Sequence, residues 1–369
     1  MQMLSLRELE SEAKQRLDPT VYDFIAGGAD DEITVQANEG AFARIGLVPR
    51  VLCGKGRPEL SLTLLGCRIA MPVLMAPTAF HRLVHEQGER ATARAAAAAG
   101  IIMITSMAST VAIEEVASAA CLSTADSPPN LWFQLYIQPD LGFTEAIIQR
   151  AEAAGCTVLV VSVDSPTFGW RERDVRNGFH DLPPGMWCEN LRMPAAASEG
   201  SRPREMVFSP ELSWEHIDWL RKKTKLKVVL KGILHPADAR LAADAGVDAI
   251  LVSNHGGRQL DGVPPAVELL PAVADELGGK IPLMVDGGIR RGTDIVKALA
   301  LGATAVAVGR PVLWGLAVGG EGGVAEVFDT LRAELARALT LCGCGSVSDV
   351  SRDLVCFPRK EELFCRLSS

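Results

Sequence analysis

Short apolar runs alternate with Ala-rich segments along most of the chain. The apolar runs end at turn or polar residues, so each is typical of a buried strand. The segments between them, such as 86–99, 145–154, 236–245 and 292–300, are rich in Ala, Glu, Arg and Leu, which favour helix. The apolar runs cover residues 72–76, 101–105, 131–136, 158–163, 227–231, 249–253, 282–286 and 305–309.

Eight strands joined by helical crossovers predict an α/β fold, a closed (β/α)8 TIM barrel rather than an open sheet. We expect residues 1–70 to form a helical and irregular N-terminal extension, and residues 71–340 to form the barrel. Segment 177–213, after the fourth strand, is rich in Pro and too long for an ordinary connection, which predicts an active-site lid loop. No low-complexity linker divides the chain, so we expect a single domain over residues 1–369.

The charge balance narrows the class of partner. A formal net charge of −8 and a pI near 5.4 argue against binding to nucleic acid or an anionic membrane, because such surfaces attract a clustered positive field. The N-terminus carries charges where a signal peptide needs an apolar core, and no apolar run reaches the roughly 18 residues of a membrane span. We therefore expect a soluble, cytoplasmic protein.

Cysteine usage does not indicate a metal site. The nine cysteines are scattered along the chain. The closest pair, Cys342 and Cys344, has no second His or Cys pair nearby to complete a tetrahedral site. We expect reduced thiols and no bound metal.

Polar residues gather at the predicted strand ends, where the active sites of TIM barrels lie. The loops after the seventh and eighth strands are the best phosphate candidates, because their glycines let backbone N–H groups approach an anion and their arginines add charge. The first loop holds Asp286, Gly287, Gly288, Ile289 and Arg290, and the second holds Gly309 and Arg310.

Two further strand ends carry candidate chemistry. Lys231 ends the fifth strand, where it is a snorkelling lysine, a cation facing a cofactor that becomes negative on reduction, or a Schiff-base lysine. His255 and Arg258 lie three residues apart in a glycine-rich loop after the sixth strand. An imidazole beside a guanidinium at a strand end favours general-base chemistry over a purely structural histidine.

The motifs around these residues resemble the FMN-dependent 2-hydroxy acid oxidase and dehydrogenase family, which includes enzymes of glycolate, lactate, mandelate and hydroxymandelate. The most specific motif is SNHGGRQLDG at 253–262, and DGGIRRGTD at 286–294 and VGRP at 308–311 support it. YDFIAGGADDE, APTA, WFQLY, SVDSP and WRERDVRNGF extend the resemblance almost end to end. The resemblance implies FMN as the cofactor, oxidation of a small 2-hydroxy acid, and a homotetramer.

The resemblance also implies catalytic and substrate-binding roles. His255 would be the active-site base, in either a carbanion or a hydride route, with Asp164 orienting and stabilising it. Arg171 and Arg258 would clamp the substrate carboxylate. Hydroxyls for the substrate would come from Tyr22 and Tyr136, the two tyrosines of the chain, although a core or interface position is the alternative for each.

The same resemblance implies how FMN would be bound. Lys231 would stabilise the negative charge of the reduced ring, and the absence of a GxGxxG fingerprint after the first strand argues against NAD. The ring and ribityl chain would contact Pro77, Thr78, Ala79, Ser106, Gln134, Ser162 and Ser253. The phosphate would lie on the two glycine-rich loops, above all on Gly288, Arg290, Gly309 and Arg310.

One departure bears on the substrate. Glycolate-type members resemble one another in carrying Trp where this chain has Ala108. A small residue there leaves room above the flavin and favours an (S)-2-hydroxy acid of lactate to mandelate size, unless Phe80, His81 or Met186 refills the space. We expect O2 to reoxidise FMN and give H2O2. The motifs leave open a dehydrogenase that uses a quinone or carrier, and an FMN-dependent isomerase of the same fold.

Overall fold

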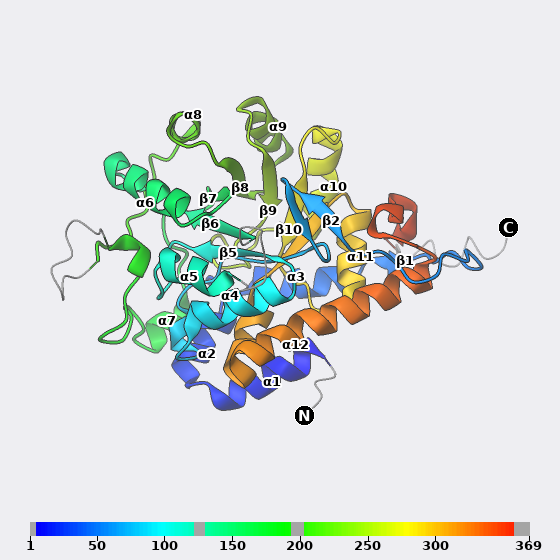
Figure 1. The fold of residues 1–369 in the computed structure, drawn as a ribbon, viewed down its shortest axis with the longest axis horizontal. Coiled ribbons are helices and arrows are strands. Elements are labelled where there is room, and N and C mark those ends of the chain that lie inside the picture. The colour runs from blue at the N-terminus through cyan, green and yellow to red at the C-terminus, as the bar shows by residue number, and fades with distance from the viewer. Residues whose placement is uncertain (1–4, 122–129, 193–202, 358–369) are drawn as a thin grey trace.

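A closed barrel of parallel strands forms the centre of the protein (Figure 1). The computed structural model describes residues 5–121, 130–192 and 203–357. Each barrel strand pairs with its neighbours in chain order, and the last strand closes against the first through Val306 and Val73. The strands are β4 (Val73–Met75), β5 (Ile102–Ser106), β6 (Leu131–Leu135), β7 (Val158–Ser162), β8 (Lys227–Ile233), β9 (Ala249–Val252), β10 (Leu283–Asp286) and β11 (Ala305–Val308). All eight predicted strands are confirmed.

Side chains alternate between the two faces of the barrel wall, as the pleat requires. In β7, Val158 and Val160 point into the barrel interior, whereas Leu159 and Val161 pack in the layer between strands and helices. Trp132 is fully buried in the interior cluster. The interior is therefore a packed core, and a ligand site has room only at a barrel end.

A hairpin covers the amino end of the barrel. Strands β2 (Leu62–Leu64) and β3 (Cys67–Ile69) pair antiparallel, and their buried residues join the barrel's interior cluster. Lys227 Nζ at the start of β8 donates to the Leu65 carbonyl at 2.6 Å. The sequence predicted only helical and irregular structure for residues 1–70. It missed the hairpin because the turn residues Leu65 and Gly66, both at positive φ, are not one of the usual hairpin dipeptides.

Helices surround the wall, and the predicted helical segments appear as α4, α6, α9 and α11. The last helix, α12, contains a break at Gly319 and Gly320, where the backbone leaves helical geometry. The helices that follow the strands are α4 (Gly88–Ala98), α5 (Ile113–Ala120), α6 (Leu141–Ala153), α8 (Trp214–Lys223), α9 (Pro236–Asp244), α10 (Ala266–Leu277), α11 (Gly292–Ala300) and α12 (Arg310–Cys342). A short helix, α7 (Glu172–Arg176), follows β7.

The N-terminal extension packs against the barrel at two places. Helix α1 (Leu6–Arg16) lies beside α12, and α2 (Pro19–Ala26) continues from it (Figure 1). Helix α3 (Ile33–Ala43) lies against the loops after β9 and β10, where the amides of Asn38 and Asn254 exchange two hydrogen bonds of 3.0 and 2.8 Å. Strands β1 (Gly46–Leu47) and β12 (Val355–Cys356) then pair the extension with the chain's last described residues.

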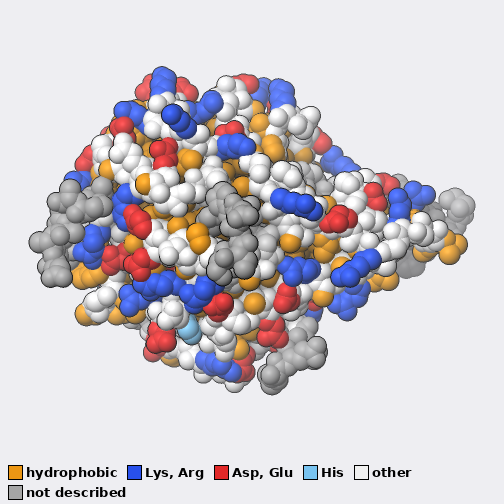
Figure 2. Space-filling model, in the orientation of Figure 1, with side chains coloured by type: hydrophobic (Ala, Val, Ile, Leu, Met, Phe, Trp, Pro, Cys, Tyr) orange, Lys and Arg blue, Asp and Glu red, His pale blue; other side chains and the backbone are white. Residues whose placement is uncertain are grey.

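Acidic and basic side chains are both scattered over the face of the molecule in Figure 2. None of the described helices is long and apolar enough to span a bilayer. The described cysteines are free thiols, and no cluster of three His, Cys, Asp or Glu residues in the described ranges could hold a metal ion.

The packing of α3 on the barrel loops makes Gly288 intolerant of a side chain. A Cβ at Gly288 would lie 2.0 Å from the Asn38 carbonyl oxygen, and the backbone is at φ +79°. Gly279 has φ +81° but open space around its Cβ position. We expect Gly279→Ala to destabilise by about 1–2 kcal/mol, from backbone strain alone, and Gly288→Ala to destabilise clearly more. Urea unfolding of both variants measures this, and equal losses would contradict it.

Candidate active site

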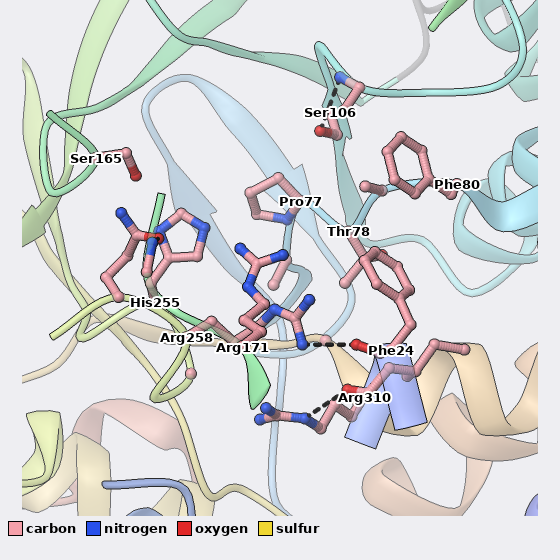
Figure 3. A pocket seen from close by; sticks show the side chains of 18 of the residues that line it. Phe24, Pro77, Thr78, Phe80, Ser106, Ser165, Arg171, His255, Arg258 and Arg310 are labelled. Carbon is pink, nitrogen blue, oxygen red and sulfur yellow. Dashed lines mark hydrogen bonds between the residues drawn. The ribbon is translucent and has the colours of Figure 1, made fainter. Parts of the chain in front are cut away.

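A cavity of about 470 Å³ lies among the loops at the carboxyl end of the barrel. This volume is within the usual range for a small-molecule or cofactor site. Its walls come from the loops after the strands, from α2, and from the segment after β7 (Figure 3). Within the predicted lid 177–213, the side chains of Phe179, Leu182, Cys188, Met206 and Phe208 contribute to the wall, and residues 193–202 lie outside the described structure.

His255 and Asp164 form a hydrogen-bonded pair at this cavity. The His255 Nδ1 lies 2.9 and 3.0 Å from the two Asp164 carboxylate oxygens. His255 is held at φ +57°, and its backbone N–H donates to the Ser253 hydroxyl at 3.0 Å. This backbone conformation is uncommon for a residue other than glycine, and it turns the imidazole toward Asp164.

The surroundings set the charges of the pair. Burial lowers the pKa of His255, and nearby Lys231 and Arg171 lower it further, although Asp164 opposes them. Burial disfavours the ionised form of Asp164, but His255 and Lys231 outweigh it and hold the Asp164 pKa at about 2. Asp164 is therefore a carboxylate and His255 a neutral imidazole at pH 7. The Nδ1–H donates to Asp164, so Nε2 carries a lone pair that is directed away from Asp164.

Two arginines line the cavity near His255 (Figure 3). Arg258 donates from one guanidinium nitrogen to the carbonyls of Phe24 and Gly27, at 2.7 and 2.8 Å, and its guanidinium carbon lies 5.0 Å from the centre of the Phe24 ring. Burial lowers the pKa of Arg258 well below its usual value, and Arg171 and Arg310 add to the effect. Arg171 lies 4.0 Å from Asp174 at its nearest carboxylate oxygen. Such desolvated, mutually repelling cations suit an anionic ligand.

Tyr136 adds a hydroxyl to the same region. Its oxygen lies 3.4 Å from His255 Nε2, and its ring packs edge-on against Phe208. Burial raises the pKa of Tyr136, and Asp164 adds to the effect. The phenol therefore stays protonated and can donate a hydrogen bond into the cavity.

Polar side chains at the wall and behind it form two hydrogen-bonded sets. Gln134 accepts from the Ser106 hydroxyl at 3.0 Å and donates to the Ser162 hydroxyl at 3.2 Å. Lys231 donates to the Ser253 hydroxyl at 3.0 Å. Of these five residues, Ser106 and Lys231 line the cavity itself. The other three support them from strands β6, β7 and the end of β9.

Both glycine-rich loops reach the cavity. The residues from Asp286 to Arg290, and Gly309 with Arg310, all line it, as do Pro77, Thr78 and Ala79. Arg310 donates to the carbonyls of Ile25 and Gly27 at 3.0 and 2.9 Å, and Arg290 pairs with Glu39 at 2.6 Å. The extension therefore holds the two arginines that were predicted to bind phosphate.

Unpartnered polar atoms in the cavity wall indicate a site for a ligand with donors and acceptors. Asp286 Oδ1, Arg290 Nε and Arg171 Nε are buried and have no hydrogen-bond partner within the described structure, although all three residues line the cavity. Buried polar atoms are normally paired. A ligand with hydroxyl donors and anionic groups would satisfy them, and the ribityl chain and phosphate of FMN are of that chemistry.

The structure does not bring Tyr22 into the site. Its ring stacks on Trp314 at 5.3 Å, with Lys14 Nζ 5.2 Å from the ring centre. Phe24, two residues later in α2, lines the cavity instead. Residues two apart on a helix point to nearly opposite faces, so only one of the two could face the cavity. The helical period of 19–26 was the signal that could have identified Phe24.

An aromatic wall was also missed from the sequence. Ala108 lines the cavity and is 3% exposed. Phe80, one of the three residues that could refill the space beside Ala108, also lines the cavity. His81 and Met186 are not part of the wall. The rings of the wall contact one another at 4.3–5.4 Å between centres, in the pairs Phe24–Phe80, Phe24–Phe179, Tyr136–Phe208 and Phe168–Phe208.

Comparisons with known proteins show which family the chain resembles. Residues 13–357 match the family described as FMN-dependent dehydrogenase. The chain is 46% identical to an L-lactate oxidase of Nostoc sp., covering 94% of this chain and 96% of that protein. It is 41% identical to 2-hydroxyacid oxidase 2 of Bos taurus, covering 97% of this chain and 100% of that one.

A solved structure of mandelate oxidase with 3,3-difluoro-2-hydroxy-3-phenylpropionic acid gives a TM-score of 0.87 at 40% identity, covering 97% of this chain and 100% of that chain. Identity at this level over nearly the full length means more than a shared barrel. The chain belongs to the FMN-dependent 2-hydroxy acid oxidase family, and its cofactor is FMN.

Proposed function

We propose that this enzyme oxidises an (S)-2-hydroxy acid of lactate to mandelate size to the 2-oxo acid, with O2 reoxidising FMN and releasing H2O2. The observation that carries the proposal is the neutral His255 paired with Asp164 in the cavity that Arg171 and Arg258 also line. A base beside two cations suits a substrate that carries an exchangeable proton next to a carboxylate. Relatives named L-lactate oxidase and 2-hydroxyacid oxidase support the choice of oxidase.

His255 acts as the base at Nε2, the ring nitrogen that does not face Asp164. When Nε2 takes a proton from the substrate, the imidazole becomes cationic, and the adjacent Asp164 carboxylate stabilises that charge. FMN, when bound, accepts the two electrons that leave the substrate α-carbon. Lys231, 3% exposed, supplies a fixed positive charge to the bound cofactor.

Arg171 and Arg258 hold the substrate carboxylate, and Tyr136 donates a hydrogen bond to the substrate. The Arg171 Nε atom is buried without a partner, and Arg258 uses one nitrogen for its two carbonyl contacts, so both guanidinium groups keep donors for a ligand. Fork-shaped guanidinium groups match the two oxygens of a carboxylate. Tyr22 has no part in this proposal, because it lies outside the cavity wall.

FMN is held by the polar edge of the cavity. Ser106 would contact the ring, with Gln134 and Ser162 behind it, and Ser253 supports Lys231. The Asp286 carboxylate would accept from ribityl hydroxyls through its unpartnered Oδ1. The remaining contacts, to the ring, ribityl chain and phosphate, come from Pro77, Thr78, Ala79, Gly287, Gly288, Ile289, Arg290, Gly309 and Arg310.

The substrate side chain lies in the aromatic part of the cavity. Ala108 leaves space that Trp would fill, and the surrounding wall of Phe24, Phe80 and Phe208 is apolar. Such a wall stabilises a methyl or phenyl substituent more than the hydrogen of glycolate, since burial of apolar area is favourable. Residues of segment 177–213 form part of this wall, which supports their role as a lid.

A panel of (S)- and (R)-hydroxy acids from glycolate to mandelate tests the reaction under anaerobic conditions. We expect (S)-acids with a side chain to bleach the flavin absorbance, and admission of air to restore it quickly. Fast recovery only after a quinone is added would replace the oxidase by a dehydrogenase. If no hydroxy acid bleaches the flavin, the isomerase alternative takes the place of this proposal.

Ala108→Trp tests the substrate size. We expect the ratio of kcat/KM for mandelate to kcat/KM for glycolate to fall at least about tenfold, because the indole would occupy the space of the phenyl group. Because both kcat/KM values come from the same variant, a general loss of activity cancels in their ratio. Ala108→Ser, which adds one atom, should leave the ratio within about twofold. An unchanged ratio in the Trp variant would exclude Ala108 as the determinant of substrate size.

Asp164→Asn tests the histidine pair through pH. Wild-type kcat/KM should fall on the acidic side, below the ordinary histidine pKa of about 6.5, as His255 becomes protonated. Because Asp164 raises the His255 pKa, its neutral replacement should move this limb to lower pH and reduce the plateau by roughly 10²–10⁴-fold. Glu172→Gln, at a carboxylate that is 39% exposed and pairs with Arg176, is the control. A limb that moves to higher pH would refute the assignment.

A further inference from the structure

The hydroxyl of Thr78 is backed by a buried histidine that the proposed reaction does not use. Thr78 lines the cavity, in the loop after β4 (Figure 3). Its methyl group lies next to Gly309. Its Oγ1 lies 2.7 Å from Nε2 of His81, which is 1% exposed and begins the one-turn helix His81–Leu83. A contact of this length between a hydroxyl and an imidazole is a hydrogen bond, and its direction depends on which ring nitrogen carries the proton.

The neighbouring contacts decide that direction. On the far side of the ring, His81 Nδ1 lies 3.1 Å from the hydroxyl of Thr92, and this hydroxyl donates to the Glu89 carbonyl at 3.1 Å. Since Thr92 gives its one proton to Glu89, its oxygen accepts from Nδ1–H. The Nε2 atom then carries only a lone pair and accepts the proton of Thr78.

The charge and the orientation of the ring are both constrained. Burial lowers the pKa of His81, although Glu89 and the Thr78 backbone oppose it. The Glu89 side chain accepts from the His81 backbone N–H at 3.1 Å and from the backbone and hydroxyl of Thr110 at 2.9 and 2.7 Å. These bonds tie the start of the histidine turn to the loop after β5. The imidazole therefore stays neutral, and the backbone that carries it is anchored to the Glu89 carboxylate.

We propose that His81 is a positioning residue that fixes the Thr78 hydroxyl as a hydrogen-bond acceptor toward bound FMN. Because the Thr78 proton is committed to Nε2, the lone pairs of Oγ1 face the cavity. They accept a donor of the cofactor, either a ring N–H or a ribityl O–H. The proposal rests on the proposed place of Thr78 at FMN, and it makes His81 act on the cofactor only through Thr78.

Titration of FMN into the deflavinated protein, followed by quenching of flavin fluorescence, tests the proposal. Thr78→Val removes the acceptor with little change in shape, and we expect it to raise the Kd about three- to tenfold. Thr78→Ser keeps the hydroxyl and should stay close to wild type. His81→Leu should raise the Kd in the same direction. His81→Gln, whose side-chain oxygen can accept from Thr78, should recover most of the affinity.

The double variant separates positioning from a merely structural role. If His81 acts through Thr78, His81→Leu should add nothing to the Kd of Thr78→Val. If His81→Leu raises the Kd by the same factor in wild type and in Thr78→Val, the proposal is overturned. An unchanged Kd in Thr78→Val would overturn it as well. Urea midpoints record any loss of stability separately. Anaerobic bleaching of the wild-type enzyme by a hydroxy acid is measured separately, so failure of the proposed reaction and failure of the Kd comparison are distinguishable.

The flavin midpoint potential identifies the donor. A lower potential in Thr78→Val than in wild type, together with the raised Kd, means that the contact stabilises the reduced ring more than the oxidised ring. An unchanged potential with a raised Kd means that the donor, a ribityl O–H or a ring N–H, is present in both oxidation states. Both results support the acceptor role of Thr78, whereas a higher potential would contradict it because the lost contact would then have favoured the oxidised ring.

Discussion

Closure of the barrel is the constraint on which the site depends. The pairing of β11 with β4 joins the last strand to the first, so the loops that follow the eight strands end in one ring. Residues far apart in the sequence thereby become neighbours. Asp164 follows β7 and His255 follows β9, yet their side chains meet at 2.9 Å. A sheet left open at the β11–β4 edge would separate the loop of Thr78 from that of Gly309, and the cavity would lose one wall.

The N-terminal extension completes what the barrel begins. Asn38 of α3 is 2% exposed, pairs with Asn254 next to His255, and lies against Gly287 and Gly288 through its side chain and carbonyl. One residue thus connects the histidine loop to the glycine-rich loop. Its neighbour Glu39 pairs with Arg290. The extension is therefore part of the site, although none of its side chains was predicted to bind the cofactor.

The sequence predicted most of what depends on local pattern. Apolar runs located every barrel strand, because strands buried on both faces are continuous and short. The glycine-rich loops, Lys231 and His255 followed from their places at strand ends. The motif in the extension led to the prediction that Tyr22 contacts the substrate. The helical period of α2 instead places Phe24 in the cavity wall.

Other features depended on contacts that no local pattern records. The aromatic wall joins Phe24 to Phe179 and Phe168 to Phe208, pairs separated by more than one element of the chain. The sequence could not predict the contact between His81 and Thr78 either. Thr92 and Glu89, which determine which ring nitrogen of His81 carries the proton, belong to the next helix. Side chains that meet only through tertiary packing give a single sequence no periodic signal, so the apolar lining and the support of Thr78 required the structure.

Buried cations at the carboxyl end of the barrel favour the binding of anions. Arg258 and Arg310 both donate to the Gly27 carbonyl, and burial, with further lowering from neighbouring arginines, reduces both pKa values, that of Arg310 to about 10. Cations held together without enough counter-charge oppose the compact arrangement. A phosphate near Arg310 and a carboxylate near Arg258 would each relieve that repulsion. Ligand binding and stability of the carboxyl end are therefore linked, since a ligand that binds only the folded state stabilises it. The buried charges at this end of the barrel therefore favour anionic ligands, and such ligands would in turn stabilise it.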